Sequence, residues 1–329
     1  MAAKWDSVKT WETFLPPTDY GEAGRGCYTA SKTERKPVSL IGSKILTFGG
    51  VPQPKLESCR AAIIPAPLEV TVTYGEGAAQ GPLAIMSASA NMELYDEVLD
   101  CSPIDQGIYT HGRVNTSGPV AESLEQIQAA VAAELEAGRL PVLLGGEHTV
   151  TVGALRAMVE RYGTGFTVLS MDAHLDMRQD YEGERLSHAT VMRRAFEMGL
   201  GVRWVGARSC SQEEIEFLRR QGIEPLWAHQ THADPDWVER ALEGLTGPVY
   251  LTLDIDGLDS GIMPATGTPE PGGLTWQQAN AWLTAVCARH QVLGLDLVEL
   301  APLAGQTAWD FTAARLLYRA LGLIFRGKL

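Results

Sequence analysis

Three side chains that commonly bind metal ions occupy alternate positions in residues 170–176, namely Asp172, His174 and Asp176. They follow an apolar, β-prone run at 166–169. Because alternate side chains of an extended backbone point to the same side, we expect all three to face one region. Carboxylates crowded in this way repel one another, and a bound cation is the simplest way to keep them ionised. The spacing therefore predicts part of a metal site at the end of a strand.

Three further predicted strands also end in polar or charged residues. His148 follows one of them, Asp254 and Asp256 follow another, and Glu299 follows the last. Ligands of open α/β sheets bind beyond the carboxyl ends of the strands. We therefore expect all of these side chains to gather at one edge of a sheet.

The predicted metal ligands are two imidazoles and four carboxylates: His148, Asp172, His174, Asp176, Asp254 and Asp256. Six protein ligands are too many for one catalytic ion that keeps an open position for water. They suit two divalent ions about 3.5–4 Å apart, whose charge would balance the four carboxylates. Oxygen-rich ligation with some imidazole favours Mn²⁺ over Zn²⁺.

Strand and helix patterns alternate along most of the chain, which is typical of a parallel sheet covered by helices on both faces. Buried strands are predicted at 61–64, 140–144, 166–169, 202–206, 248–253 and 291–297, with a possible short strand at 45–48. Helices are predicted at 82–88, 117–137, 151–162, 189–198, 212–221, 235–245, 275–289 and 308–321. Pro65 and Pro67 should end the first strand. The fold class expected is α/β.

Two regions are expected: an N-terminal extension at 1–58, which packs on the body or on a neighbouring subunit, and a single catalytic domain at 59–329. The net charge of −13 disfavours nucleic acid and anionic lipid as partners and favours a cationic ligand. No apolar run of about 18 residues predicts a membrane span. The chain begins without the apolar stretch of a secretory signal, and its five cysteines are scattered. We therefore expect a cytoplasmic protein.

Several segments resemble the ureohydrolases, the family that includes arginase and agmatinase. The matching stretches are Gly-Gly-Glu-His at 145–148, Met-Asp-Ala-His-Leu-Asp at 171–176, and the Asp-Ile-Asp segment at 253–259 with 264–269. Residues 74–82 and 91–96 look like agmatinase segments. The resemblance covers about residues 60–325, and the order of three separate metal motifs makes it specific.

This resemblance implies a three-layer α/β/α fold with a mostly parallel sheet and a binuclear Mn²⁺ site, with Ni²⁺ as an alternative. One ion would take His148, Asp172, Asp176 and Asp254, and the other Asp172, His174, Asp254 and Asp256. On the family pattern, water activated between the ions attacks a guanidinium carbon. Glu299 would hold the guanidinium, and His188 would carry a proton to the leaving amine. The family also implies homo-oligomers, either trimers or hexamers.

The loop at 177–186 bears on the substrate. It lacks the Asn, Thr and Ser with which arginase-type chains recognise an α-amino acid, but it carries Asp180, Glu182 and Glu184, which could attract a terminal ammonium. Agmatine therefore fits best as the small cationic guanidino substrate, with urea and putrescine as products. Ser260 and Gly305 depart from the commoner agmatinase pattern. 4-Guanidinobutyrate, free guanidine with Ni²⁺ and arginine thus stay open as substrates.

Two other classes of function compete with this hypothesis. A zinc deacetylase could share the architecture, but such enzymes use one Zn²⁺ and lack the full set of six ligands. A non-catalytic polyamine-binding protein would be expected to have lost a ligand, and this chain has lost none. The histidines outside these motifs carry less information: His111 could line the mouth of a site or lie in an ordinary loop, and His229 and His232 are expected at the surface.

Overall fold

A computed structural model describes residues 46–327 of the chain. Within them the sheet has seven strands in the order β2-β1-β3-β7-β6-β4-β5, and every neighbouring pair is parallel. The strands are β1 (Ala61–Ala66), β2 (Ile108–Thr110), β3 (Leu140–Gly145), β4 (Thr167–Met171), β5 (Gly201–Val205), β6 (Val249–Asp254) and β7 (Val292–Val298). The predicted α/β class with a parallel sheet is confirmed.

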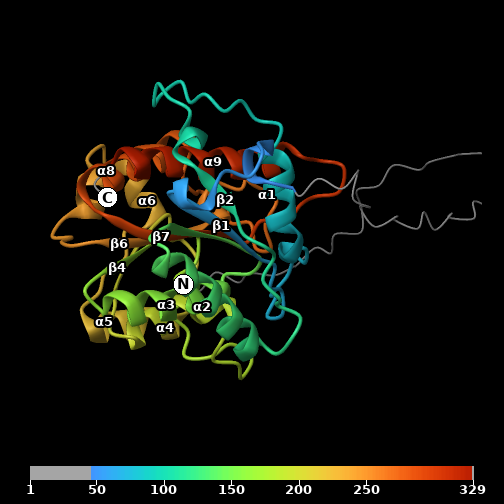
Figure 1. Ribbon diagram of the computed structural model, residues 1–329. Coiled ribbons are helices and arrows are strands. Elements are labelled where there is room, and N and C mark those ends of the chain that lie inside the picture. The colour runs from blue at the N-terminus through green and yellow to red at the C-terminus, as the bar shows by residue number, and fades with distance from the viewer. Residues whose placement is uncertain (1–45, 328–329) are drawn as a thin grey trace, which may run out of the picture. The chain divides into compact units, whose positions relative to one another are not determined.

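Helices cover both faces of the sheet and complete three layers (Figure 1). The helices are α1 (Gly81–Ser89), α2 (Val120–Glu136), α3 (Val150–Tyr162), α4 (Val191–Glu197), α5 (Gln212–Gln221), α6 (Ala228–Ala233), α7 (Trp237–Leu242), α8 (Trp276–Arg289) and α9 (Ala308–Arg326). One hydrophobic cluster joins α1, α7, α8 and α9 to one face, and a second joins α2 to α5 to the other. Among the described residues, no helix is both long enough and apolar enough to span a bilayer.

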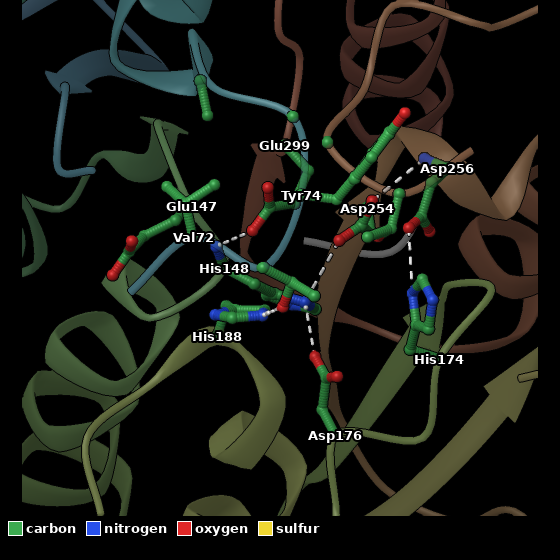
Figure 2. Close-up of a pocket in the computed structure, with 15 residues that line it drawn as sticks. Val72, Tyr74, Glu147, His148, His174, Asp176, His188, Asp254, Asp256 and Glu299 are labelled. Carbon is green, nitrogen blue, oxygen red and sulfur yellow. Dashed lines mark hydrogen bonds and ion pairs between the residues drawn. The ribbon is translucent and has the colours of Figure 1, made fainter. Parts of the chain in front are cut away.

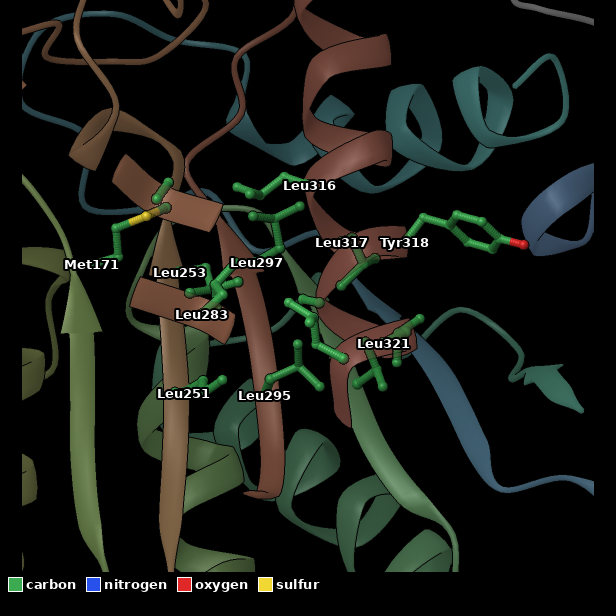
Figure 3. Close-up of a cluster of buried hydrophobic side chains, with 14 of the residues drawn as sticks. Met171, Leu251, Leu253, Leu283, Leu295, Leu297, Leu316, Leu317, Tyr318 and Leu321 are labelled. Carbon is green, nitrogen blue, oxygen red and sulfur yellow. The ribbon is translucent and has the colours of Figure 1, made fainter. Parts of the chain in front are cut away.

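The central strands are apolar along their whole length because both of their faces are buried. Leu251 and Leu295, from β6 and β7, are completely buried and lie in the layer that also holds Leu283 of α8 and Leu317 of α9 (Figure 3). Their side chains alternate with residues that enter the opposite cluster, such as Tyr250. The rigid centre of the sheet thus fixes where each strand ends.

Helix starts and ends follow local capping chemistry. The Ser211 hydroxyl accepts a hydrogen bond from Glu214 N at the start of α5, and Gly222 ends that helix with a left-handed φ of 67°. Thr275 and Gln278 form the equivalent capping box at the start of α8. Such caps satisfy backbone groups that the first and last turns leave unpaired.

The predicted end of the first strand at Pro65 is wrong, because β1 continues to Ala66. The carbonyl of Pro65 and its missing N–H face the side of β2, and β2 has already ended at Thr110. No ladder hydrogen bond is therefore lost, while Ala66 pairs with β3 on the opposite side. Proline is tolerated in a strand at such an edge.

Other departures from the predicted elements have local causes. The possible strand at 45–48 is wrong for its described part, where Phe48–Gly50 forms a 3-10 turn. The edge strand β2 is only three residues long and α6 only six, too short to produce a recognisable period. The predicted helix at 189–198 begins with a 3-10 turn, His188–Thr190, before α4.

Part of the predicted N-terminal extension packs into the body. Phe48 is completely buried and lies 6.3 Å from Tyr318 between ring centroids. Gln53 exchanges two hydrogen bonds with the backbone of Thr110 on β2. Residues 1–45 of the extension lie outside the described residues, so its predicted contact with a neighbouring subunit stays a prediction.

Truncating a central side chain should show how much the sheet depends on this packing. Leu251→Ala is expected to lower the free energy of unfolding by about 2–5 kcal/mol, because a buried leucine leaves a cavity. Urea unfolding followed by circular dichroism measures the change. Leu83→Ala on α1, where the side chain is 56% exposed, is the matched control and should stay within about 0.5 kcal/mol of the wild type. Equal losses in the two variants would contradict this account.

Candidate active site

The predicted metal ligands and Glu299 converge beyond the carboxyl ends of four adjacent strands, β3, β7, β6 and β4 (Figure 2). A pocket of about 30 Å³ lies over them. The predicted residues that line it are His148, His174, Asp176, His188, Asp254, Asp256 and Glu299. The sixth predicted ligand, Asp172, is completely buried beneath them.

Three carboxylates surround one nitrogen of His148. The Nδ1 atom lies 3.3 Å from Asp172 Oδ2, 3.0 Å from Asp176 Oδ2 and 3.3 Å from Asp254 Oδ2. β4 ends at Met171, so the predicted alternation along an extended strand does not place these ligands. A loop does so instead, and Asp176 has a left-handed φ of 50°. These side chains do lie together, as expected, but the prediction that an extended strand carries them is wrong.

The other nitrogen of His148 fixes which tautomer is present. Nε2 lies 2.6 Å from Thr252 Oγ1, and the Thr252 hydroxyl donates to Asp296 Oδ1 at 2.6 Å. Because the only proton of Thr252 goes to Asp296, Nε2 must be the donor to Thr252. In the neutral ring Nδ1 is then left with a lone pair, and within residues 46–327 no group forms a hydrogen bond with this buried atom.

A lone pair that faces three carboxylates fits a bound cation. The ligand atoms of His148, Asp172 and Asp254 lie within 4.8 Å of one another. Imidazole nitrogen and carboxylate oxygen are suitable donors for a divalent transition metal. At many metal sites a carboxylate behind the ligating histidine fixes the orientation of its ring. Asp296 could orient His148 in this way through the Thr252 hydroxyl.

A second group of ligands lies beside the first and shares Asp172 with it. His174 Nδ1 lies 3.0 Å from Asp256 Oδ2 and 3.8 Å from Asp172 Oδ1. Ligand atoms of these three residues also lie within 4.8 Å of one another. Two adjacent groups with a common aspartate match the ligand sharing expected of a binuclear site.

The electrostatics of the first group show how unfavourable the bare carboxylates are. Burial and the neighbouring charge of Asp176 raise the pKa of Asp172 to about 7. Burial, together with Asp256 and Asp172, raises the pKa of Asp254 well above its usual value. Burial disfavours protonation of His148, but the three surrounding carboxylates outweigh this effect and raise the pKa of His148. Positive charge is therefore required here to keep the carboxylates ionised.

The second group behaves as an ion pair. Burial opposes ionisation of both partners, but the charge of His174 lowers the pKa of Asp256 to about 2, and Asp256 raises the pKa of His174 to about 10. In this arrangement a proton on His174 neutralises the carboxylate. A divalent cation could take the place of that proton.

Glu299 stands at the wall of the pocket, as predicted. It has a left-handed φ of 65°, and its Oε1 accepts a hydrogen bond from His148 N at 2.5 Å. Burial raises the pKa of Glu299 to about 8. Strained backbone at a residue other than glycine tends to persist where function requires it. A carboxylate with this environment is suited to pairing with a buried cation.

His188 lies across the pocket from Glu299 (Figure 2). Its Nδ1 lies 3.0 Å from Thr71 Oγ1, and its Nε2 lies 2.8 Å from Thr73 Oγ1. The ring also packs edge-on against Tyr181, with 5.2 Å between centroids. Burial lowers the pKa of His188. A largely neutral imidazole beside the pocket is suited to accepting and returning a proton.

Thr71 and Thr73 both contact His188 but were not among the residues predicted from the sequence. The recurrence of threonine at alternate positions of Val-Thr-Val-Thr (70–73) was the available signal, although the backbone there bends at residues 70, 71 and 73 and is not extended. The glycine-rich loop that follows, at 74–82, lies at the rim of the pocket, and Tyr74 is 84% exposed there. Gly75 N donates to Gly267 O at 3.0 Å and joins the rim to the 264–269 segment.

The acidic loop at 177–186 lies beside the pocket and not over it. Glu182 and Glu184 line a separate cavity of about 490 Å³ between this loop, residues 70–72 and the start of α2. Asp180 Oδ1 instead accepts a hydrogen bond from Gly183 N. Their predicted role in attracting a terminal ammonium stays a prediction.

The remaining histidines are not among the residues that line this pocket. His111 Nδ1 lies 2.6 Å from the carbonyl oxygen of its neighbour Gly112. His229 and His232 are exposed on α6. This placement favours an ordinary loop position for His111.

Comparison with known proteins identifies the family. The Arginase family model matches residues 59–322. An N(1)-aminopropylagmatine ureohydrolase from Synechocystis sp. is 38% identical over 273 residues, which cover 79% of this chain and 87% of that protein. An agmatinase from Pyrococcus horikoshii is 33% identical over 269 residues, covering 80% and 92%.

A solved structure agrees with these matches. The agmatine ureohydrolase of Thermoplasma volcanium superimposes with a TM-score of 0.78 and 27% identity, covering 86% of this chain and 95% of that one. The family match spans all four strand ends that form the pocket. On this evidence, the chain belongs to the arginase family.

Proposed function

We propose that this protein hydrolyses the guanidino group of an agmatine-type cation and releases urea and an amine. The observation that supports this most directly is the pair of His/Asp groups that share Asp172, with Glu299 and His188 lining the same pocket. The similarity to relatives named agmatinase and N(1)-aminopropylagmatine ureohydrolase points to the same reaction. The other classes considered, a zinc deacetylase and a non-catalytic binding protein, receive no comparable support.

The residues around the pocket have complementary tasks in this reaction. The Glu299 carboxylate would hold the planar guanidinium through charge-assisted hydrogen bonds, which fixes its orientation. His148, Asp172, Asp176, Asp254, His174 and Asp256 would hold two divalent cations. Bound divalent cations lower the pKa of a coordinated water and thereby supply a nucleophile near neutral pH. His188 would deliver a proton to the departing nitrogen, which leaves as a neutral amine.

Manganese is the metal that we propose. Four carboxylates and two imidazoles form an oxygen-rich donor set, which suits Mn²⁺ better than thiophilic metals. No cysteine is among the residues that line the pocket. Ni²⁺ is the alternative, because it also binds imidazole and carboxylate. The metal supply, rather than the ligand set alone, selects between them.

The pocket opens toward a second cavity of about 270 Å³ that could receive the far end of a substrate. The two share Thr73, His174, Asp176, His188 and Thr268 as wall residues. Glu270 lines the outer part and could attract a distant amino group. This continuity makes N(1)-aminopropylagmatine, which carries an added aminopropyl arm, a second candidate beside agmatine.

A panel of guanidino compounds tests the proposed reaction. With Mn²⁺ present, we expect urea from agmatine or N(1)-aminopropylagmatine at a much higher kcat/KM than from arginine, 4-guanidinobutyrate or free guanidine. The acidic pocket disfavours the carboxylates of arginine and 4-guanidinobutyrate, and free guanidine lacks the distant amino group that Glu270 would attract. Urea is measured colorimetrically and the amine product by chromatography. Failure of the whole panel with both Mn²⁺ and Ni²⁺ would sink the enzyme hypothesis.

Asp254→Ala tests the metal site. We expect this variant to lose metal at both positions, since Asp254 is proposed to bridge the ions, and chelation of the wild type should abolish urea release until Mn²⁺ is restored. Inductively coupled plasma analysis gives the ions per chain. Asp236→Ala, which removes an exposed carboxylate at the start of α7, is the matched control. Two ions per chain in Asp254→Ala would refute the bridging role.

His188→Ala tests the proton transfer. We expect kcat to fall by about 10²–10⁴-fold, the usual range for general acid–base catalysis, with metal content intact. His229→Ala, which removes an exposed imidazole on α6, should keep full activity. Loss of metal from His188→Ala would show that its role is misassigned.

A further inference from the structure

Two threonine hydroxyls from one short segment contact both nitrogens of His188. Thr71 and Thr73 are separated by a single residue, and their Oγ1 atoms lie 3.0 Å from Nδ1 and 2.8 Å from Nε2 respectively. The backbone bends at Thr71 and at Thr73, and the two hydroxyls form a clamp with one hydroxyl on each nitrogen of the ring. Ser187 Oγ makes only a longer contact with Nδ1, at 3.3 Å.

Glu147 determines the direction of the hydrogen bonds on the Nδ1 side. The Thr71 hydroxyl donates to Glu147 Oε1 at 3.1 Å, and its oxygen accepts the backbone N–H of His188 at 3.1 Å. A hydroxyl has one proton and two acceptor sites, so the remaining site must accept from Nδ1. The imidazole therefore carries its proton on Nδ1 and presents an unprotonated Nε2.

The carboxylate of Glu147 is itself held in place. It is 1% exposed, and its Oε2 accepts hydrogen bonds from the backbone N–H groups of Val70 and Thr71, each at 2.7 Å. Loss of a hydrogen-bond donor to a buried carboxylate oxygen costs free energy, and the Thr71 hydroxyl is such a donor to Glu147 Oε1. This cost keeps the Thr71 proton on Glu147 and stops it from turning toward His188.

On the opposite side of the ring, the Thr73 hydroxyl is also hydrogen-bonded to the Tyr181 hydroxyl, 3.0 Å away. Both groups can donate or accept, so they can rotate to match either protonation state of Nε2. Thr73 and Tyr181 also line the cavity that adjoins the pocket. The Nε2 side is thus adaptable, while the Nδ1 side is fixed.

We propose that Glu147 and Thr71 are positioning residues that hold His188 in the Nδ1-protonated tautomer, so that Nε2 exchanges the catalytic proton. The proposal rests on the proposed function of His188 as the proton carrier. It explains why the Gly-Gly-Glu-His motif has a glutamate before its metal ligand. It also assigns the Val-Thr-Val-Thr segment a role in positioning His188.

Three substitutions separate orientation from simple packing. Thr71→Val keeps the shape of the side chain but removes the hydroxyl, and we expect kcat to fall by about 10- to 100-fold with KM and metal content unchanged. Thr71→Ser keeps the hydroxyl and should retain kcat close to the wild type. Glu147→Gln presents an amide donor to Thr71, which reverses the hydrogen-bond direction at Nδ1 and should reduce kcat as Thr71→Val does.

Thr231→Val is the matched control, because it removes a buried hydroxyl that donates only to Ala228 O within its own helix. Its kcat should equal that of the wild type. The measurements are kcat and KM for urea release, ions per chain and the melting temperature. An unchanged kcat in Thr71→Val would overturn the proposal. A fall in kcat that Thr71→Ser fails to rescue, or that follows a loss of metal, would overturn it as well.

A crystallographic test distinguishes failure of this proposal from failure of the proposed function. If the wild type released no urea from any guanidino compound, the proposed function would fail whatever the clamp does. The orientation would then be judged from crystal structures of the metal-loaded wild type and Thr71→Val. A ring that turns or shifts only in Thr71→Val supports the clamp, and a ring that neither moves nor changes its tautomer, as read from its ¹⁵N chemical shifts, overturns it.

Discussion

The repulsion among carboxylates buried at one edge of the sheet is the constraint on which this structure depends. Asp172, Asp254 and Asp256 are almost completely buried within one small volume, and Asp176 is close beside them. The raised pKa values of Asp172 and Asp254 show that burial and mutual repulsion make their ionised forms unfavourable without added positive charge. Added positive charge, such as that of bound cations, would relieve this repulsion and keep Asp172 and Asp254 ionised at neutral pH, whereas Asp256 is already paired with His174.

The parallel sheet makes this concentration of charge possible. β3, β7, β6 and β4 are neighbours, although they are far apart in the sequence, and their carboxyl ends meet at the same edge. The sheet also orients the ligands from below. Thr252 of β6 and Asp296 of β7 are register partners, and the hydrogen bond between them directs Nδ1 of His148 into the site. The apolar packing of the strands therefore supports the chemistry directly.

The loops around the edge are tied down by polar contacts rather than by packing. Arg208 donates hydrogen bonds to five backbone carbonyls, including those of Asp256 and Glu270. It thereby joins the loop after β6 to the segment that carries Glu270 at the second cavity. Glu69 accepts hydrogen bonds from three successive backbone N–H groups at 77–79, at the start of the 3-10 turn that precedes α1. A Cβ could not fit at Gly146, where it would lie 2.0 Å from the carbonyl oxygen of Leu68. The predicted metal ligands are thus held at the ends of the central strands, and a substrate would contact the loops around them.

The sequence by itself determined the class of fold and predicted which side chains meet at one edge of the sheet. Alternating strand and helix patterns identified the parallel sheet, and polar residues at the ends of apolar runs identified His148, Asp172, His174, Asp176, Asp254 and Asp256. Spacing along the chain was sufficient, because the carboxyl ends of parallel strands must share an edge. The same reasoning placed Glu299 at the pocket.

Only the tertiary structure decided how these residues are oriented. Asp176 reaches the site through a left-handed turn and not through an extended strand. Thr71, Thr73 and Glu147 surround His188 from segments 41 to 117 residues away in the chain. Hydrogen bonds between distant segments leave no periodic signal in a sequence, because periodicity records only the geometry of local backbone. Such contacts determine which nitrogen of His148 and of His188 carries a proton, and they exist only once the chain has folded.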